Sequence, residues 1–100
     1  MIDFDRVEGF DWDNGNARKS MIKHGVSQAE AEQVFFKEPL IVSPDVAHSG
    51  VEARFQALGS TEVGRPLHVA FTLRNEGRLI RVISARSMNR KERLRYEQET

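Results

Sequence analysis

The spacing of apolar residues in the first forty positions predicts two short helices. The first would begin at Asp13 or Asn14 as its N-cap and end at His24, with Gly25 in the left-handed conformation that often follows a helix. Its apolar stripe is expected to contain Ala17, Met21 and Ile22.

The second helix has a stronger start signal. Ser27 is followed three residues later by Glu30, which is the spacing of a capping box, and Pro39 prevents the helix from continuing. Apolar residues then follow at helical spacing: Ala31, Val34 and Phe35. The two helices would form a helical hairpin.

From residue 40 onward, apolar and polar residues alternate, which predicts strands. The expected strands cover residues 40–42, 53–57, 67–74 and 78–84. Because short links join them, an antiparallel meander is favoured, with Asn75-Glu76-Gly77 as the tight turn before the last strand. Strict alternation along that strand places Arg81 on one face and both Ser84 and Arg86 on the other.

Residues 87–97 are rich in good helix formers and predict a third helix. The predicted fold class is therefore α+β, with two N-terminal helices, a four-stranded antiparallel sheet and a C-terminal helix. We expect the helices to lie against one face of the sheet and to leave the other face partly open. Because 100 residues is the size of one compact domain, residues 1–100 are expected to form a single one.

The composition excludes several classes of protein. Without cysteine, the chain has no disulfide framework, no cysteine zinc site and no thiol nucleophile. The N-terminus lacks the basic and apolar regions of a secretory signal, and the apolar runs are far shorter than the roughly 20 residues of a membrane helix. We therefore expect a cytoplasmic protein that does not enter a membrane.

The net charge is zero, but the charges are unevenly distributed. Residues 1–50 carry nine acidic and five basic side chains, whereas residues 51–100 carry six acidic and ten basic ones. Seven basic residues lie between positions 78 and 95, where Glu92 is the sole acid. This asymmetry favours an anion-binding face, although a basic helix is often only a solvated surface.

Motifs of common enzyme classes are absent from the sequence. It contains no phosphate-binding glycine loop, no HExxH and no GxSxG. His24, His48 and His68 do not show the spacing of metal ligands. We therefore expect neither a metal site nor a cofactor.

Three arginines interrupt the apolar strand segments: Arg54, Arg81 and Arg86. Because burying an arginine costs free energy unless it finds a partner, each could pair with a carboxylate such as Glu52 or Glu92, or extend to solvent. Alternatively, their guanidinium groups could bind phosphate, which they match in geometry. RNA carries its own nucleophile, the 2′-OH, so such a site would need only orientation, cations, a base and an acid.

Two histidines could transfer the proton of that hydroxyl, because histidine titrates near neutral pH. His24 stands at a predicted helix end, where it could instead interact with the helix dipole. His48 lies in a loop, where functional residues are common but solvated bystanders are commoner. The sequence leaves the identity of the base open.

A series of short segments runs through nearly the whole chain. It includes Phe10-Asp11-Trp12-Asp13, Lys23-His24-Gly25-Val26, Asp45 with His48, Glu52-Ala53-Arg54-Phe55, Ile80-Arg81-Val82-Ile83-Ser84-Ala85-Arg86 and Arg90-Lys91-Glu92-Arg93. Each segment is weakly specific alone, but the ordered series resembles the BrnT toxins of bacterial toxin–antitoxin pairs.

This resemblance implies a RelE-like ribonuclease fold, growth arrest by metal-independent RNA cleavage, and a BrnA-like ribbon-helix-helix antitoxin whose dimer holds two toxins. The residues expected to carry catalysis are Arg54, Arg81, Ser84, Arg86 and His24. The residues expected to bind RNA are Lys23, His48, Arg90 and Lys91. The alternative is a non-catalytic module that binds nucleic acid or protein through the same fold.

Overall fold

The computed structural model describes residues 2–100. Its strands are β1 (Gly9–Phe10), β2 (Ile41–Pro44), β3 (Arg54–Ser60), β4 (Pro66–Arg74) and β5 (Leu79–Ser87). Its helices are α1 (Lys19–His24), α2 (Gln28–Gln33) and α3 (Arg90–Glu99), with the short 3-10 helices η1 (Phe4–Arg6) and η2 (Val46–His48). Within the described residues, no helix has the length and apolar character needed to cross a membrane.

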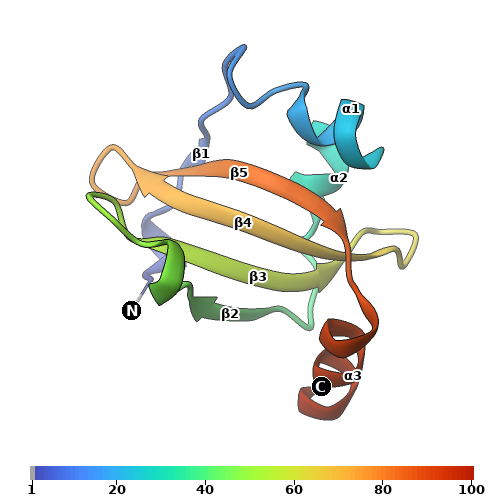
Figure 1. Cartoon of the computed structure of the whole chain (residues 1–100). Helices are drawn as coiled ribbons and strands as arrows, with labels where there is room; N and C mark the ends of the chain where they lie inside the picture. The colour runs from blue at the N-terminus through green and yellow to red at the C-terminus, as the bar shows by residue number, and fades with distance from the viewer. Residues whose placement is uncertain (1) are drawn as a thin grey trace.

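The strands form a mixed sheet in the order β1-β5-β4-β3-β2 (Figure 1). Strands β2 to β5 are antiparallel, as predicted, but β1 is a fifth strand that pairs with β5 in parallel. The α+β class is confirmed, whereas the prediction of two opening helices followed by four antiparallel strands is wrong, because η1 and β1 precede α1. With two residues, β1 is too short to show alternation and depends on its pairing with Leu79 and Ile80.

The first helix is shorter than its sequence pattern predicts. It begins at Lys19 and not at Asp13, because side chains before it form hydrogen bonds that compete with helical ones. Asp13 Oδ1 accepts a hydrogen bond from the Gly15 amide at 2.7 Å, and Asn16 Oδ1 accepts one from the Asp13 amide at 2.8 Å. At the other end, Gly25 has a φ of 68° and provides the predicted left-handed cap.

Small polar residues, and not the expected apolar stripe, fasten α1 to the sheet. Ile22 is 81% exposed. Ser20 is buried and its hydroxyl accepts a hydrogen bond from the Ala85 amide at 2.7 Å, while the Asn16 side-chain amide donates to the Val82 carbonyl at 2.9 Å. Strand β1 pairs with only the first two residues of β5. Beyond it, these side chains provide hydrogen-bond partners for backbone groups at the edge of β5.

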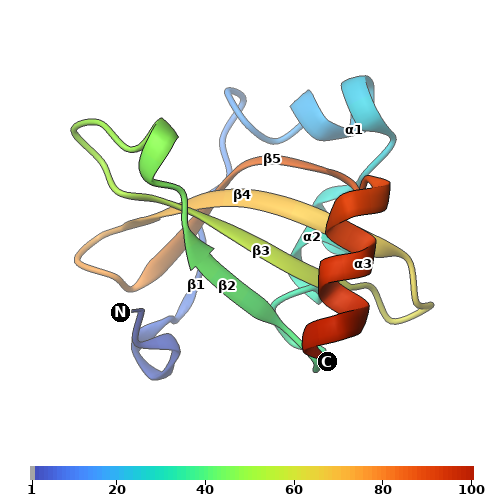
Figure 2. The same ribbon diagram turned by 60° about the horizontal axis from the view of Figure 1, so that its bottom comes forward.

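The core lies between α2 and one face of the sheet (Figure 2). The predicted capping box is present, with the Glu30 amide donating to Ser27 Oγ at 3.1 Å and the Ser27 amide donating to the Glu30 carboxylate at 3.0 Å. The buried apolar cluster consists of Val26, Ala31, Val34, Ala57, Leu67, Val69, Phe71, Ile80, Val82 and Ala85.

The opposite face of β3, β4 and β5 carries polar residues, and we call it the polar face. Directly paired residues on neighbouring strands point to the same side of a sheet, so the register defines its rows. The rows across β3, β4 and β5 are Arg54–Thr72–Arg81, Gln56–Ala70–Ser84 and Leu58–His68–Arg86.

An irregularity in β5 brings its polar residues to this one face. Ser84 pairs with one residue of β4 and Val82 pairs with the next, so Ile83 is an extra residue in the strand. Such a bulge shifts the alternation by one position. The prediction that Arg81 lies opposite Ser84 and Arg86 is therefore wrong, and all three share the polar face.

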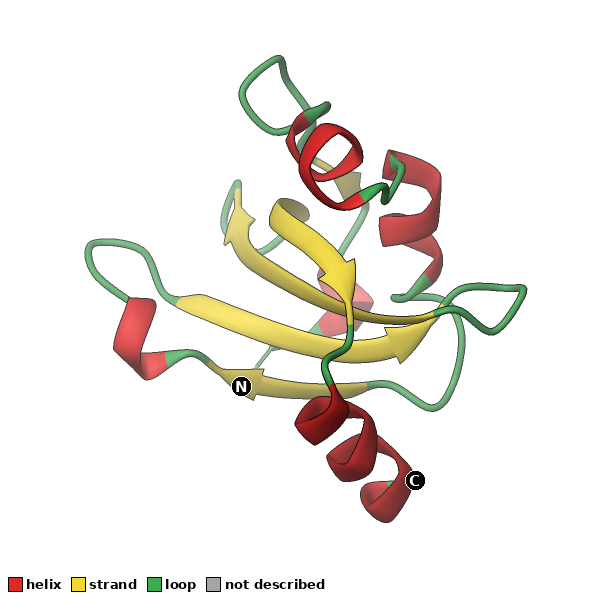
Figure 3. Ribbon diagram, turned by 45° about the vertical axis from the view of Figure 1, so that its right-hand side comes forward, coloured by secondary structure: helices red, strands yellow, loops and turns green. Residues whose placement is uncertain are grey.

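Helix α3 lies on the polar face, apart from α1 and α2 (Figures 2 and 3). None of its residues is buried, so the helix adds no side chain to the core. Polar contacts hold it instead, including the Tyr96 hydroxyl, which donates to the Pro39 carbonyl. The expectation that the helices share one face of the sheet is therefore wrong for α3.

Candidate functional site

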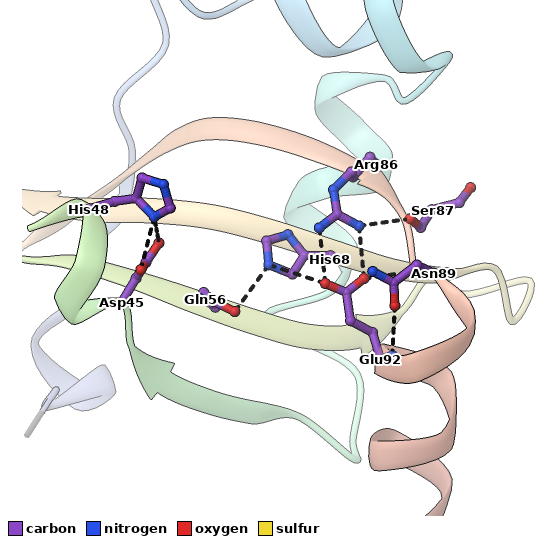
Figure 4. A network of polar contacts seen from close by, with 8 residues as sticks. All are labelled: Asp45, His48, Gln56, His68, Arg86, Ser87, Asn89 and Glu92. Atoms are coloured by element: carbon purple, nitrogen blue, oxygen red, sulfur yellow. Dashed lines mark hydrogen bonds and ion pairs between the residues drawn. The ribbon is translucent and has the colours of Figure 1, made fainter.

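A network of polar contacts crosses the polar face (Figure 4). It consists of two groups of contacts. One joins Asp45 and His48 at η2, and the other joins Gln56 on β3, His68 on β4 and Glu92 on α3. Thus η2 and α3 border the face at opposite ends, and the sheet lies between them.

Arg86 forms a two-pronged ion pair with Glu92, with Nη1–Oε1 and Nη2–Oε2 distances of 2.8 and 2.9 Å. Glu92 also accepts the amide of Asn89 in the capping box of α3. Although burial raises the pKa of Glu92, the hydrogen bonds from Arg86 and Asn89 lower it overall, and Glu92 in turn raises the pKa of Arg86. Both groups are charged at neutral pH, and together they attach α3 to β5.

His68 is buried beneath this ion pair, with 8% of its surface exposed. Its Nε2 lies 3.3 Å from Gln56 Oε1 and 3.8 Å from Glu92 Oε2, while its Nδ1 is buried without a hydrogen-bond partner in residues 2–100. Burial, followed by the positive charge of Arg86, lowers the pKa of His68. His68 is therefore neutral at neutral pH and belongs to the interior of the network.

Arg81 pairs with the acidic segment that follows β1. Its Nη1 and Nη2 lie 3.0 and 3.2 Å from the carboxylate oxygens of Asp13, and Nη1 lies 3.5 Å from Asp11. The hydrogen bond from Arg81 lowers the pKa of Asp13, and the same bond raises the pKa of Arg81. Arg81 and Arg86 thus both have carboxylate partners, which is one of the two alternatives that the sequence left open.

Arg54 differs from both, because it is exposed and its side chain has no ion-pair partner among residues 2–100. It borders a shallow hollow of about 190 Å³ that is also lined by Lys19, Thr72, Arg74 and Arg81. Arg74 is held by Glu52 at 3.0 Å, whereas Lys19, like Arg54, has no acidic partner in the described chain. The hollow therefore presents unpaired positive charge to solvent.

Asp45 and His48 form a hydrogen-bonded pair at the border of the polar face (Figure 4). His48 Nδ1 lies 2.9 Å from Oδ2 and 3.1 Å from Oδ1 of Asp45. The His48 side chain is 70% exposed, whereas that of Asp45 is 12% exposed. The hydrogen bond from His48 lowers the pKa of Asp45, so the carboxylate is ionised at neutral pH and orients the imidazole.

Two further hydrogen bonds tie the segment of this pair to the start of β3, and a third lies within the segment. The Asp45 amide donates to the Arg54 carbonyl at 2.8 Å, and the Arg54 amide donates to Ser49 Oγ at 3.0 Å. The Ser49 hydroxyl donates to the Asp45 carbonyl at 2.8 Å. The backbone of Arg54 is therefore fixed relative to the segment that carries Asp45 and His48.

The structure brings four of the predicted catalytic residues to one face: Arg54, Arg81, Ser84 and Arg86. Lys23 and His24 are in the last turn of α1, which packs along β5, and they belong to none of the three rows. Arg90 and Lys91 are exposed in the first turn of α3, beside the Arg86–Glu92 ion pair.

Sequence reasoning did not identify Asp45 as the partner of His48, and it did not place Gln56 or His68 in a site. The three-residue spacing of Asp45 and His48 was a usable signal, because residues i and i+3 eclipse each other in a 3-10 helix. In the sequence, His68 is one of the polar residues that alternate with apolar ones along β4, which gives no sign of a special role. It becomes buried beneath Glu92 because α3 packs there. In residues 2–100, no three His, Asp or Glu side chains gather as a possible metal site.

Comparison with known protein families identifies the family of the chain. Residues 12–92 match a family model described as "Ribonuclease toxin, BrnT, of type II toxin-antitoxin system". No curated protein matches the chain. The matched segment contains the polar face, the Asp45–His48 pair and the Arg86–Glu92 ion pair. The chain therefore belongs to the BrnT family, the ribonuclease toxins of type II toxin–antitoxin systems.

Proposed function

We propose that this toxin cuts RNA on its polar face as a metal-independent endoribonuclease, with the 2′-OH of the RNA as the nucleophile. The observation that supports the proposal most directly is the unpaired guanidinium of Arg54, which is tied through its backbone to the Asp45–His48 pair. One exposed cation and one oriented imidazole, carried by two hydrogen-bonded segments, fit the needs of in-line attack on a phosphodiester.

In this proposal Arg54 binds the phosphate that is cut. Arg81 and Arg86 keep N–H donors that their carboxylate partners do not use, since a guanidinium has five, and these donors contact neighbouring phosphates. Ser84 contributes a hydroxyl between them. Lys23, Arg90 and Lys91 extend the RNA-binding surface. His24, predicted to be catalytic, lies on α1 outside the three rows of the polar face.

The test uses purified toxin with free RNA in EDTA and, separately, with RNA on translating ribosomes in magnesium; the effect of EDTA is read on free RNA alone. We expect cleavage that leaves 2′,3′-cyclic phosphate or 3′-phosphate ends together with 5′-hydroxyl ends, because the 2′-OH attacks the adjacent phosphate. Arg54→Ala should remove the cleavage. Complete inhibition by EDTA that magnesium reverses would refute the metal-independent mechanism.

We also propose that the antitoxin is a BrnA-like ribbon-helix-helix protein, that its dimer holds two toxins in the cytoplasm, and that it covers the polar face and α3. The exposed basic side chains of α3 favour an acidic or amphipathic segment as the covering element. Arg81→Glu and Arg86→Glu should each weaken the complex, and light scattering of the co-expressed proteins should give a mass of two toxins and two antitoxins. A complex that still cuts RNA, or a stable toxin dimer without a partner, would contradict this arrangement.

One observation favours a second candidate, a module that binds nucleic acid without cutting it. Both Arg81 and Arg86 already have carboxylate partners, so their charges are less available to a reacting phosphate. The same assay separates the two functions, because binding of RNA without cleavage under all of these conditions would support the module.

A further inference from the structure

We propose that His48 is the general base of this site and that Asp45 is its positioning residue. The inference rests on the proposed ribonuclease function and assigns its proton transfer to one atom, Nε2 of His48. It follows from the geometry of η2, from the exposure of the imidazole and from the link between this segment and Arg54.

The hydrogen bond to Asp45 determines which ring nitrogen can accept a proton. In neutral His48, Nδ1 must carry the hydrogen in order to donate to the ionised carboxylate at 2.9 Å. The lone pair is then on Nε2, which has no partner among residues 2–100 and belongs to a side chain that is 70% exposed. A carboxylate that selects this tautomer also stabilises the imidazolium that forms.

The surroundings of the other histidines favour His48 for this role. His68 is buried, so RNA cannot reach its ring, and His24 lies on α1, away from the three rows of the polar face. His48 instead belongs to the segment that is hydrogen-bonded to Arg54, the proposed phosphate ligand. The backbone positions that carry the base and the cation are therefore held together, which lowers the entropic cost of orienting the reacting groups.

The step is a transesterification. As the 2′ oxygen bonds to phosphorus, its proton passes to Nε2 of His48, and Arg54 stabilises the negative charge on the phosphoryl oxygens. The bond between phosphorus and the 5′ oxygen breaks, and the leaving oxygen takes a proton from water. The hydroxide that remains removes the proton from His48, so the products are a 2′,3′-cyclic phosphate and a 5′-hydroxyl.

The proton transfer should leave a signature in the pH dependence of cleavage. The rate should fall as the pH falls, because protonated His48 cannot accept a proton. The titratable or charged groups near His48 are Asp45 on its own segment, Arg54 on β3 and His68 on β4, whose pKa Asp45 affects.

The experiment measures kcat/KM against pH for the wild type, His48→Gln, His48→Ala, Asp45→Asn and the control Val46→Ala, whose side chain is exposed on the same 3-10 turn. Binding is measured separately with an RNA that carries a 2′-deoxyribose at the cleavage point. We expect kcat/KM of His48→Gln to be at least 100-fold lower, in keeping with the usual contribution of a general base. The fall of the rate at low pH should also disappear from its pH profile. Its binding of the deoxy-substituted RNA should stay within about threefold.

The other variants distinguish a base from a structural residue. Added imidazole should restore part of the activity of His48→Ala. Asp45→Asn should lose about tenfold in kcat with KM unchanged, because an amide can also donate to Nδ1 and so no longer selects the tautomer with a free Nε2. If the wild type cleaves RNA and His48→Gln cleaves it at the same rate and with the same pH profile, the assignment of His48 is overturned and the ribonuclease proposal stands. An inactive wild type on every RNA would instead overturn the proposed function itself.

Discussion

Asn16 offers the sharpest test of how the N-terminal segment is fastened to the sheet. Its side chain is 6% exposed and makes three hydrogen bonds, although it lies in an irregular turn. The amide nitrogen donates to the Val82 carbonyl at 2.9 Å and to the Asp11 carbonyl at 3.0 Å, and Oδ1 accepts from the Asp13 amide at 2.8 Å. Asn16→Ala removes all three bonds and adds no new partner.

The cost can be worked from these contacts. The Val82 carbonyl is in a buried contact and stays unsatisfied, which costs about 1–3 kcal/mol, and each of the two part-buried groups loses about 0.5–1 kcal/mol when water replaces the bond. We therefore expect the free energy of unfolding to fall by about 3 kcal/mol. For a domain of this size, that corresponds to a drop in Tm of roughly 12–24 °C.

Guanidinium denaturation measures this change, with Asn14→Ala as the matched control. Asn14 is an exposed neighbour in the same turn, and its side chain makes no hydrogen bond within residues 2–100. The control should stay within about 0.5 kcal/mol of the wild type. If Asn16→Ala behaves like the control, these hydrogen bonds do not fasten the segment to β5 and the reasoning is refuted.

Four further substitutions should have distinct effects. A Cβ at Gly59 would lie 2.8 Å from Val34 Cγ1, so Gly59→Ala should destabilise the protein by about 1–3 kcal/mol in denaturation, whereas Gly50→Ala, in open space, should not. Arg54→Ala should abolish growth arrest and leave Tm within about 2 °C, but Arg86→Ala should also cost about 1–2 kcal/mol because Glu92 stays half-buried without its cation. The pKa of Glu92 is lowered in the fold, so its stabilising effect is present above its ordinary pKa of 4.5 and is lost as pH falls below it; Glu92→Gln should flatten this acid dependence of Tm.

Local signals predicted much of the fold correctly. The Ser27–Glu30 capping box, the left-handed Gly25 and the turn at Asn75-Glu76-Gly77, where all three φ values are positive, each depend on neighbouring residues alone. The alternation of apolar and polar residues also predicted β3, β4 and β5, because one side of each strand faces the core, although the bulge at Ile83 interrupts it in β5. The ordered segments that resemble the BrnT toxins extended this reading to the family, which the match over residues 12–92 shows.

The amino-acid pattern was thus enough to predict the α+β class, the order of the four strands β2 to β5 and the family. The tertiary structure alone decided three features of the site: the shared face of Arg81 and Ser84, the pairing of β1 with β5, and the partners of each arginine. A bulge and a two-residue strand have almost no local pattern, since their free energy comes from pairing with a distant strand. The ion pair of Arg81 is likewise long-range, because its partner Asp13 is 68 residues away along the chain. Only the packing of the Asp13 segment against the sheet brings Asp13 Oδ2 within 3.0 Å of Arg81 Nη1.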